Sequence, residues 1–317
     1  MSATGGPQVA HLRKIAIVGF GKIARDQHVA AIADNPDFQL EAIVSSSATH
    51  EDVPVFRTIE AALASGLALD AIALCTPPQV RRDACELATA NGLAVLLEKP
   101  PAATVEEARA LAAMGESRGT TVFAGWHSRF APFVADARAW CESHDVFHGQ
   151  ITWHEDPAKW HPGQQWLWQS GGLGVFDPGI NALSILTAIR PGTWQLAGAT
   201  IEQPENAETP SAAHFRLGRN EDEIDVSFRF SVGGTETWSI RLLAENGDSL
   251  LLLDGGGVLS LNGGPAVRRP NAEYAGIYQR FAELMAARQI EVDVTPLDLV
   301  EEALRTADIT PVGPVTI

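Results

Sequence analysis

Lys99 is the residue of this sequence best placed to take part in proton transfer. It follows the apolar run Ala94–Leu97, which is typical of a buried parallel strand, and Pro100 and Pro101 end that strand. Ligands of open α/β sheets bind at the carboxyl ends of the strands, and a lysine is almost never buried there without a partner. The position suits a lysine that handles a proton beside a nicotinamide ring.

A glycine pattern typical of dinucleotide-binding loops covers residues 19–24. The sequence Gly19-Phe20-Gly21-Lys22-Ile23-Ala24 reads G-x-G-x-x-A and stands between a strand-like run at 14–18 and a helical pattern at 22–34. The two glycines allow a tight turn and the close approach of a pyrophosphate, and the N-terminus of the helix offers unpaired N–H groups. We therefore predict NAD or NADP binding here; the alternative is a tight structural turn.

The residues after the second strand-like run, 39–44, leave the choice of coenzyme open. An acidic residue there usually holds the ribose of NAD, and an arginine usually holds the 2′-phosphate of NADP, but this chain has Ser45, Ser46 and Ser47. Lys22 or Arg57 could supply a positive charge, and we expect use of both coenzymes.

A third loop, Thr76-Pro77-Pro78, follows the strand-like run 70–75. A rigid loop at the carboxyl end of a strand can shelter the nicotinamide; the alternative is a plain turn.

Strand-like and helix-like patterns alternate through the first part of the chain, which indicates a doubly wound parallel sheet. The second part has strand-like runs at 151–154, 212–217, 223–232, 235–244, 249–253 and 257–261. Several of their connections are too short for crossover helices, which favours a mainly antiparallel sheet. We expect an α/β protein with an N-terminal Rossmann domain at 1–126 and a C-terminal α+β domain at 127–317. Helices are expected at 272–288 and 296–309, and the last of them could pack back on the Rossmann domain.

The composition excludes several classes of protein. The net charge of −16 argues against binding to nucleic acids and to anionic membranes. The three cysteines have no metal-like spacing and give no disulfide framework, and His127, His154 and His161 lack the spacing of metal ligands, so we expect no metal. Residues 1–10 do not resemble a signal peptide and no apolar run reaches about 18 residues, which favours a cytoplasmic protein.

Four motifs in one order resemble the Gfo/Idh/MocA oxidoreductase family. They are GFGKIA at 19–24, CTPP at 75–78, EKP at 98–100 and GGLGVFDPGIN at 171–181. Three further segments, GKIARDQH at 21–28, WHSR at 126–129 and WHPGQQWLW at 160–168, are similar to family members that oxidise L-arabinose or D-galactose. The resemblance implies NAD(P)-dependent oxidation of an aldopyranose (L-arabinose, D-galactose or D-fucose) at C1 to the aldonolactone.

The resemblance also implies a pair of proton-handling residues, Lys99 and Asp177. Either Asp177 takes the proton of the C1 hydroxyl while the Lys99 ammonium lowers the pKa of that hydroxyl, or a neutral Lys99 takes the proton. The residues alone fit Asp177 equally well as a helix N-cap, because Asp-Pro precedes an apolar helical run. Many family members have a histidine at the position of Asn181. The amide of Asn181 fits hydrogen bonding to a sugar hydroxyl rather than base catalysis.

The remaining candidate site residues are assigned mainly from the resemblance. We expect Asn181, His161, Trp160, Glu155 and His127 to bind the substrate, with Trp160 as a wall against the sugar ring. For His127, substrate contact and interdomain hydrogen bonding fit equally well. The expected coenzyme contacts are Gly19, Phe20, Gly21, Lys22, Ile23, Ser45, Ser46, Thr76, Pro77, Glu98 and Lys99.

Two other functions fit the same residues. One is another dehydrogenase or reductase of the family, acting on inositol, a dihydrodiol or a keto-sugar. The other is a noncatalytic sensor of a sugar or dinucleotide, which Lys99 and Asp177 argue against, since a binder needs no proton-transfer pair. The family's sheet faces often pair, so we expect a homodimer.

Overall fold

The computed structural model describes residues 12–220 and 222–315, which form two compact units. The first unit contains the chain up to Ala102, then Glu107–Gly125 and Tyr274–Val292; the second contains Ala103–Glu106, Trp126–Glu273 and the chain from Asp293. The expectation for residues 1–10 lies outside the described residues. Within them, no helix is both long enough and apolar enough to cross a membrane.

The first unit contains a parallel sheet, which confirms the predicted Rossmann fold. Its strands run in the order β3-β2-β1-β4-β5-β6. They are β1 (Arg13–Val18), β2 (Phe38–Val44), β3 (Val55–Phe56), β4 (Ala71–Leu74), β5 (Ala94–Glu98) and β6 (Val122–Gly125). The order reverses between β1 and β4, and in open α/β sheets ligands bind at such a point, beyond the carboxyl ends of the strands.

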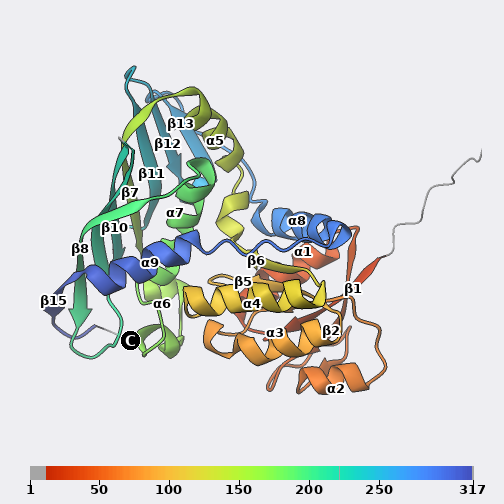
Figure 1. Ribbon diagram of the computed structural model, residues 1–317. Coiled ribbons are helices and arrows are strands. Elements are labelled where there is room, and N and C mark those ends of the chain that lie inside the picture. The colour runs from red at the N-terminus through yellow and green to blue at the C-terminus, as the bar shows by residue number, and fades with distance from the viewer. Residues whose placement is uncertain (1–11, 221, 316–317) are drawn as a thin grey trace, which may run out of the picture. The chain divides into compact units, whose positions relative to one another are not determined.

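Helices surround this sheet, and α3 packs on β4 and β5 (Figure 1). They are α1 (Val29–Ala33), α2 (Ile59–Ala64), α3 (Arg81–Ala90), α4 (Val105–Arg118) and α8 (Glu273–Ala287). The strands β4 and β5 are buried along their whole length, as apolar strands covered on both faces must be.

The helical segment after the glycine-rich loop differs from the sequence prediction. We expected an ordinary helix over 22–34, but residues 24–28 form a π-helical turn that α1 continues from Val29. The turn ends at His28, which is fully buried. A π-turn is often found at functional sites, and no residue pattern in the sequence signals this one.

Helix α8 joins the first unit although it lies far along the chain. Phe281 stacks on Phe38 of β2 with ring centroids 5.6 Å apart, and its ring lies 6.3 Å from that of Phe123 in β6. The helix expected at 296–309 is α9 (Thr295–Thr306), which belongs to the second unit. Its packing on the Rossmann domain stays a prediction. The apolar face of α8 supplies the aromatic rings that the sheet of the first unit buries.

The second unit contains a nine-stranded sheet in the order β14-β13-β12-β11-β7-β10-β9-β8-β15. Its strands are β7 (Val146–Glu155), β8 (Gln195–Pro204), β9 (Ala212–Arg219), β10 (Asp222–Phe230), β11 (Thr237–Ala244), β12 (Ser249–Leu253), β13 (Val258–Leu261), β14 (Val267–Arg268) and β15 (Asp308–Val312). Only the pairs β7–β10 and β8–β15 are parallel, so the sheet is mainly antiparallel, as predicted.

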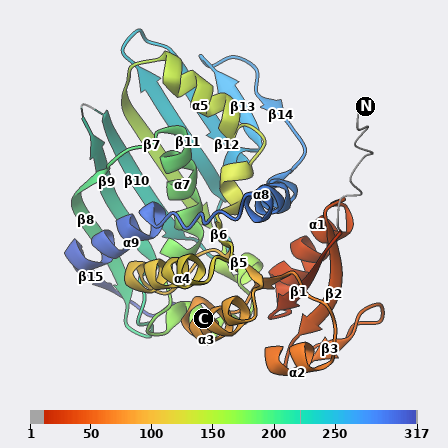
Figure 2. The ribbon, with the colours of Figure 1, turned by 45° about the vertical axis from the view of Figure 1, so that its right-hand side comes forward.

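Helices α5 (Val134–Ser143) and α7 (Phe176–Ile189) lie on one face of this sheet (Figure 2). The short α6 (Pro157–Trp160) follows β7. Helix α7 is buried almost all round, and Phe176 meets Phe215 and Phe228 of the sheet in a cluster of three aromatic rings. This packing fixes the helix that carries Asp177 and Asn181.

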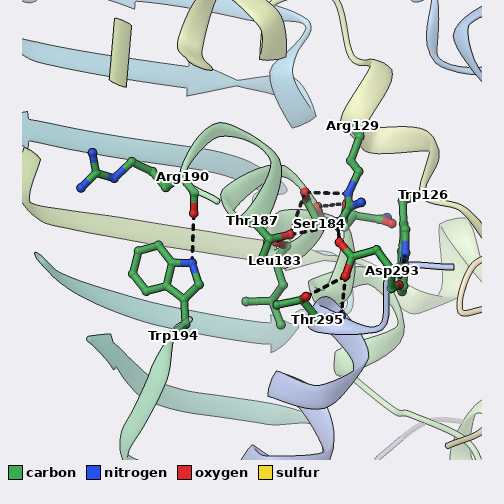
Figure 3. A network of polar contacts seen from close by, with 10 residues as sticks. Trp126, Arg129, Leu183, Ser184, Thr187, Arg190, Trp194, Asp293 and Thr295 are labelled. Atoms are coloured by element: carbon green, nitrogen blue, oxygen red, sulfur yellow. Dashed lines mark hydrogen bonds and ion pairs between the residues drawn. The ribbon is translucent and has the colours of Figure 1, made fainter. Parts of the chain in front are cut away.

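A polar network within the second unit also holds α7. The guanidinium of Arg129 pairs with the carboxylate of Asp293, and it donates to the carbonyl oxygen of Ser184 (3.2 Å) and the hydroxyl of Thr187 (3.1 Å) on α7 (Figure 3). Thr295 donates its N–H and hydroxyl to Asp293. Burial would raise the pKa of Asp293, but the charge of Arg129 and these donors lower it overall.

We predict that Gly179→Ala destabilises the protein by about 1–3 kcal/mol, because the added methyl group overpacks the interface of α7 with β10. A Cβ at position 179 would lie 2.4 Å from a ring carbon of Phe228. Urea denaturation measures the change, and Gly313→Ala is the control, since a Cβ there meets nothing within 4 Å. A Gly179→Ala variant as stable as the wild type would contradict this packing.

Candidate active site residues

The loops after β1 and β4 meet at Gly19. Its φ of +86° favours glycine, and a Cβ there would lie 2.8 Å from the backbone nitrogen of Thr76. Any side chain at position 19 would therefore push apart the loops that follow two neighbouring strands. The expected tight turn is present, and its position coincides with the reversal of strand order.

Gly21 is different, because a Cβ there would meet nothing within 4 Å. The fold itself does not need a glycine at this position, which leaves close approach of a ligand as the reason for one. The next residue, Lys22, forms an ion pair with Asp26 one turn later, and Arg25 donates to the carbonyl oxygen of Phe20 (2.8 Å). The positive charge expected at Lys22 is therefore partly neutralised.

The carboxyl ends of β2 and β3 bring Ser45 and Arg57 near each other. The strands pair at Val44 and Phe56, so the next residue of each lies at the same edge of the sheet. Ser45 accepts hydrogen bonds from two N–H groups of its own loop. Arg57 is exposed and lines an open pocket with residues 48–55.

Thr76 has a buried hydroxyl oxygen with no hydrogen-bond partner among the residues that the structure describes. A buried polar group is normally satisfied, so an unsatisfied one beside Gly19 indicates a ligand that supplies the missing bond. The carbonyl oxygen of Thr76 accepts from the Arg81 guanidinium at 2.6 and 2.9 Å.

Lys99 lies just beyond β5 and is half-buried. Its backbone N–H donates to the side chain of Glu98 at 2.9 Å. The carboxylate of Glu98 is buried in the first unit and accepts from His28 (2.9 Å) and Tyr274 (2.7 Å). The expected contact of Glu98 with the coenzyme stays a prediction.

Asp177 and Asn181 lie one turn apart in α7, in the second unit. The N-cap position of α7 is Val175, so Asp177 stands in the first helical turn and is not the cap. Its side chain is 4% exposed. Asn181 is half-buried, and its carbonyl oxygen accepts from Ser184 at 2.7 Å.

Glu155 and His161 form a pair within the second unit. The Nε2 of His161 lies 2.8 Å from a carboxylate oxygen of Glu155, which is 6% exposed. A carboxylate accepts, so Nε2 carries the hydrogen and the ring has a fixed orientation. The other ring nitrogen, Nδ1, lies 3.4 Å from the side-chain oxygen of Gln164. The two neighbours together set the direction of the His161 ring.

Trp160 is the exposed member of the tryptophan-rich stretch, with 36% of its surface accessible, whereas Trp153 and Trp168 are buried in the core. Its indole N–H donates to Glu236. The ammonium of Lys159 lies 4.7 Å from its ring centroid, and the Trp238 ring lies 5.2 Å away. The indole is thus held in place by its neighbours.

His127 faces Glu273 at 3.3 Å, and its Nδ1 lies at the same distance from the Ser128 hydroxyl. Burial would raise the pKa of Glu273, but the positive charge and hydrogen bond of His127 lower it overall. No pattern in the sequence indicates this partner, or the contacts of Arg81, Tyr274 and Glu236. No cluster of described residues has three side chains arranged to hold a metal ion.

Three comparisons place this chain among known proteins. The model of the Gfo/Idh/MocA oxidoreductase family with its NAD-binding Rossmann fold matches residues 13–126. A galactose 1-dehydrogenase of Pseudomonas fluorescens is 40% identical over 291 residues, which are 92% of this chain and 94% of the relative. The chain belongs to the Gfo/Idh/MocA family.

Solved structures agree with this assignment. The crystal structure of a Rhizobium etli D-galactose 1-dehydrogenase superposes with a TM-score of 0.93 at 40% identity, covering 98% of this chain and all of the other. A 3-ketoreductase of Actinomadura kijaniata shares the fold with a TM-score of 0.80 at 16% identity, over 95% of this chain and 99% of the other. This Gfo/Idh/MocA protein is an oxidoreductase, and its cofactor is NAD or NADP.

The residues of the first unit fit that cofactor. Gly19 allows the tight turn, Gly21 leaves room for a pyrophosphate, and the Thr76 hydroxyl, which has no partner among the described residues, lies at the point where the strand order reverses. Residues 19–23 would hold the phosphates, and Ser45 and Arg57, which follow β2 and β3 at the same edge of the sheet, would face the adenosine ribose.

We predict that Gly19→Ala and Gly21→Ala have different effects. Gly19→Ala should lower the melting temperature, because its Cβ would collide with Thr76, whereas Gly21→Ala should leave the melting temperature unchanged. Gly21→Ala should weaken coenzyme binding by at least about tenfold, since its methyl group would occupy space that the pyrophosphate needs. Fluorescence titration with NADH and NADPH, combined with thermal unfolding, makes both measurements. Unchanged coenzyme affinity in Gly21→Ala would contradict the assigned site.

Proposed function

We propose that this protein oxidises an aldopyranose at C1 to the aldonolactone with NAD(P)⁺. The observation that carries the proposal is identity of 40% along nearly the whole length of a galactose 1-dehydrogenase. The chain also has Lys99 beyond β5, and Asp177 and Asn181 on α7, which are the groups that such a reaction requires. D-Galactose, L-arabinose and D-fucose are the proposed substrates.

Oxidation at C1 removes a hydride from carbon and a proton from the C1 hydroxyl. Bound NAD(P)⁺ supplies the hydride acceptor. Lys99 and Asp177 handle the proton, either with Asp177 as the base and the Lys99 ammonium beside the hydroxyl, or with a neutral Lys99 as the base. Asn181 hydrogen-bonds a sugar hydroxyl.

The other substrate contacts hold the sugar ring. His161, oriented by Glu155, donates to or accepts from a hydroxyl, and Trp160 offers an apolar ring to the C–H groups of the sugar. His127, paired with Glu273, is a further proposed contact. Together they keep the reacting atoms in one orientation, which is a large part of the rate gain in such a reaction.

We predict that Lys99→Met and Asp177→Asn each lower kcat by about 10²–10⁴-fold, the usual contribution of a positioned acid or base. Steady-state assays with D-galactose measure kcat, and fluorescence titration checks that NADH and NADPH still bind. If either variant keeps normal kcat, its residue has no part in proton handling.

We predict overlapping activity on D-galactose, L-arabinose and D-fucose. The three sugars share the hydroxyl arrangement at C2–C4 and differ at C5, and a pocket rejects one small group only by about 10–200-fold. Reduction of NAD⁺ or NADP⁺ followed by absorbance gives kcat/KM for each sugar, with myo-inositol as the control. Turnover of myo-inositol alone would indicate a different member of the family. Thermal stabilisation by sugars without turnover would indicate a sensor.

Arg57 is the proposed partner of the 2′-phosphate of NADP. It is exposed at the end of β3 beside Ser45, and, unlike Lys22, it forms no ion pair with the residues that the structure describes. The chain has no acidic residue directly after β2, so both coenzymes are expected to serve.

We predict that Arg57→Ala lowers kcat/KM for NADP⁺ by about 10–100-fold and leaves that for NAD⁺ within about threefold, because only NADP⁺ loses a charged partner. Lys22→Ala is the matched variant, and its effect should be smaller because Asp26 already neutralises Lys22. An equal loss for both coenzymes in Arg57→Ala would contradict the assignment. A wild-type kcat/KM more than about a thousandfold higher with NAD⁺ than with NADP⁺ would also contradict the assignment of Arg57.

The homodimer and the cytoplasmic location stay predictions. Light scattering on the purified protein determines whether it is a homodimer.

A further inference from the structure

A group of ionisable side chains is buried beneath the end of β5, within the first unit. Glu98 is 6% exposed, Tyr274 is 5% exposed, and His28 and Tyr278 have no exposed surface. None of these side chains takes part in the proposed proton transfer. Ionisable groups are rarely buried to this extent unless they are paired and hydrogen-bonded.

The Glu98 carboxylate is the centre of this group. One oxygen accepts from His28 Nε2 at 2.9 Å and from the Tyr274 hydroxyl at 2.7 Å. The other oxygen accepts from the backbone N–H of Lys99 at 2.9 Å. Three donors from three separate parts of the chain therefore converge on one carboxylate, and one of them is the main chain of Lys99.

The protonation of His28 matches this arrangement. Burial alone would lower the pKa of His28, but Cys75, Tyr278 and Glu98 favour the charged form and raise it well above its usual value. Burial also raises the pKa of Tyr278 to about 12, and the hydroxyl of Tyr278 lies 2.7 Å from His28 Nδ1. In its charged form the His28 ring donates through both nitrogens, to Glu98 and to this hydroxyl.

Arg81 makes a second set of contacts, which hold the main chain on both sides of Lys99. The guanidinium of Arg81, which is 2% exposed, donates to the carbonyl oxygens of Glu98 and Pro100. The same guanidinium donates to the carbonyl oxygen of Thr76. The residues before and after Lys99 are therefore fixed to each other and to the loop after β4.

We propose that Glu98 and His28 are positioning residues for Lys99, and that their buried pair fixes the main chain from which the lysine side chain extends. A buried ion pair contributes little stability compared with apolar residues of the same size, so stability alone does not explain it. Fixing the direction of a reacting group does explain it, because a displacement of 1 Å can lower a rate by about 100-fold. The inference rests on the proposed role of Lys99.

The first test is Glu98→Gln, which keeps the shape of the side chain but leaves one acceptor oxygen for three donors. We expect kcat with D-galactose to fall about 10–100-fold, with the sugar KM and the NADPH Kd within about threefold of the wild type. The control is Glu41→Gln, which removes the 2.9 Å ion pair with Lys14 in the same unit and should leave kcat unchanged. If Glu98→Gln does not fold, Tyr274→Phe removes one donor from the same carboxylate and should lower kcat in the same way.

The second test uses a conservative replacement. His28→Leu removes the donor to Glu98 and should lower kcat as Glu98→Gln does, whereas His28→Gln keeps an N–H group of similar reach and should restore part of the loss. A lower melting temperature without a change in kcat, in both Glu98→Gln and His28→Leu, would assign the pair a purely structural role and overturn the proposal.

The third test is the pH dependence of stability. The charged and titratable groups facing His28 are Cys75 after β4, Glu98 of β5, and Tyr274 and Tyr278 of α8. Because the pKa of His28 is raised in the folded state, its contribution is complete below about pH 6.5 and is lost as the pH rises through the folded value. Urea denaturation should therefore show a higher free energy of unfolding for the wild type than for His28→Gln below about pH 6.5. This difference should shrink as the pH rises above that value. A constant difference would show that His28 and Glu98 do not form an ion pair and would overturn the proposal.

These outcomes separate the inference from the proposed function. Normal kcat in Lys99→Met would remove the role of Lys99 and with it the inference. Impaired Lys99→Met together with fully active Glu98→Gln and His28→Leu would leave the function intact and overturn the inference alone.

Discussion

The arrangement of the first unit depends on the close approach of two loops at Gly19. The backbone nitrogen of Thr76 lies where a side chain at position 19 would begin, so the loops after β1 and β4 touch through their main chains. These strands are neighbours at the point where the strand order reverses. Contact at this point lets one ligand reach both loops. The Thr76 hydroxyl, which is buried and has no hydrogen-bond partner among the described residues, belongs to one of them.

Arg81 links the loop of Thr76 to the segment that carries Lys99. Its guanidinium reaches the carbonyl oxygen of Thr76 and those of Glu98 and Pro100. Hydrogen bonds to the main chain therefore connect the loop after β4 to the segment after β5. In the second unit, Arg129 has the equivalent task, because it ties α7, the helix of Asp177, to Asp293. Both units use a largely buried arginine to hold the segment that carries a proposed reacting residue.

The parts of this structure that sequence predicts are those that local patterns determine. The G-x-G-x-x-A turn, the strand before Lys99 and the mainly antiparallel second sheet each follow from neighbouring residues. The prediction missed α5, β8 and β15, and in β8 the buried positions show no regular alternation because the strand bends at a register shift near Gly198. The π-helical turn at 24–28 has no residue pattern that distinguishes it from an ordinary α-helix.

The missed site residues have a different cause. Tyr274 and Tyr278 meet Glu98 and His28 across more than 170 positions of sequence, and only the folded chain brings them together. Arg81 acts on carbonyl oxygens, which every residue has, so no pattern of side chains reveals its partners. Buried polar networks of this kind leave isolated charged or aromatic residues in the sequence, without a spacing that identifies them.

The proposed reaction removes a hydride from C1 of an aldose. D-Galactose with deuterium at C1 follows this step when the mass of the reduced coenzyme is measured. The coenzyme should gain the deuterium, and hydride transfer should be slower than with unlabelled sugar. Reduced coenzyme without deuterium would show that another carbon is oxidised and would rule out oxidation at C1.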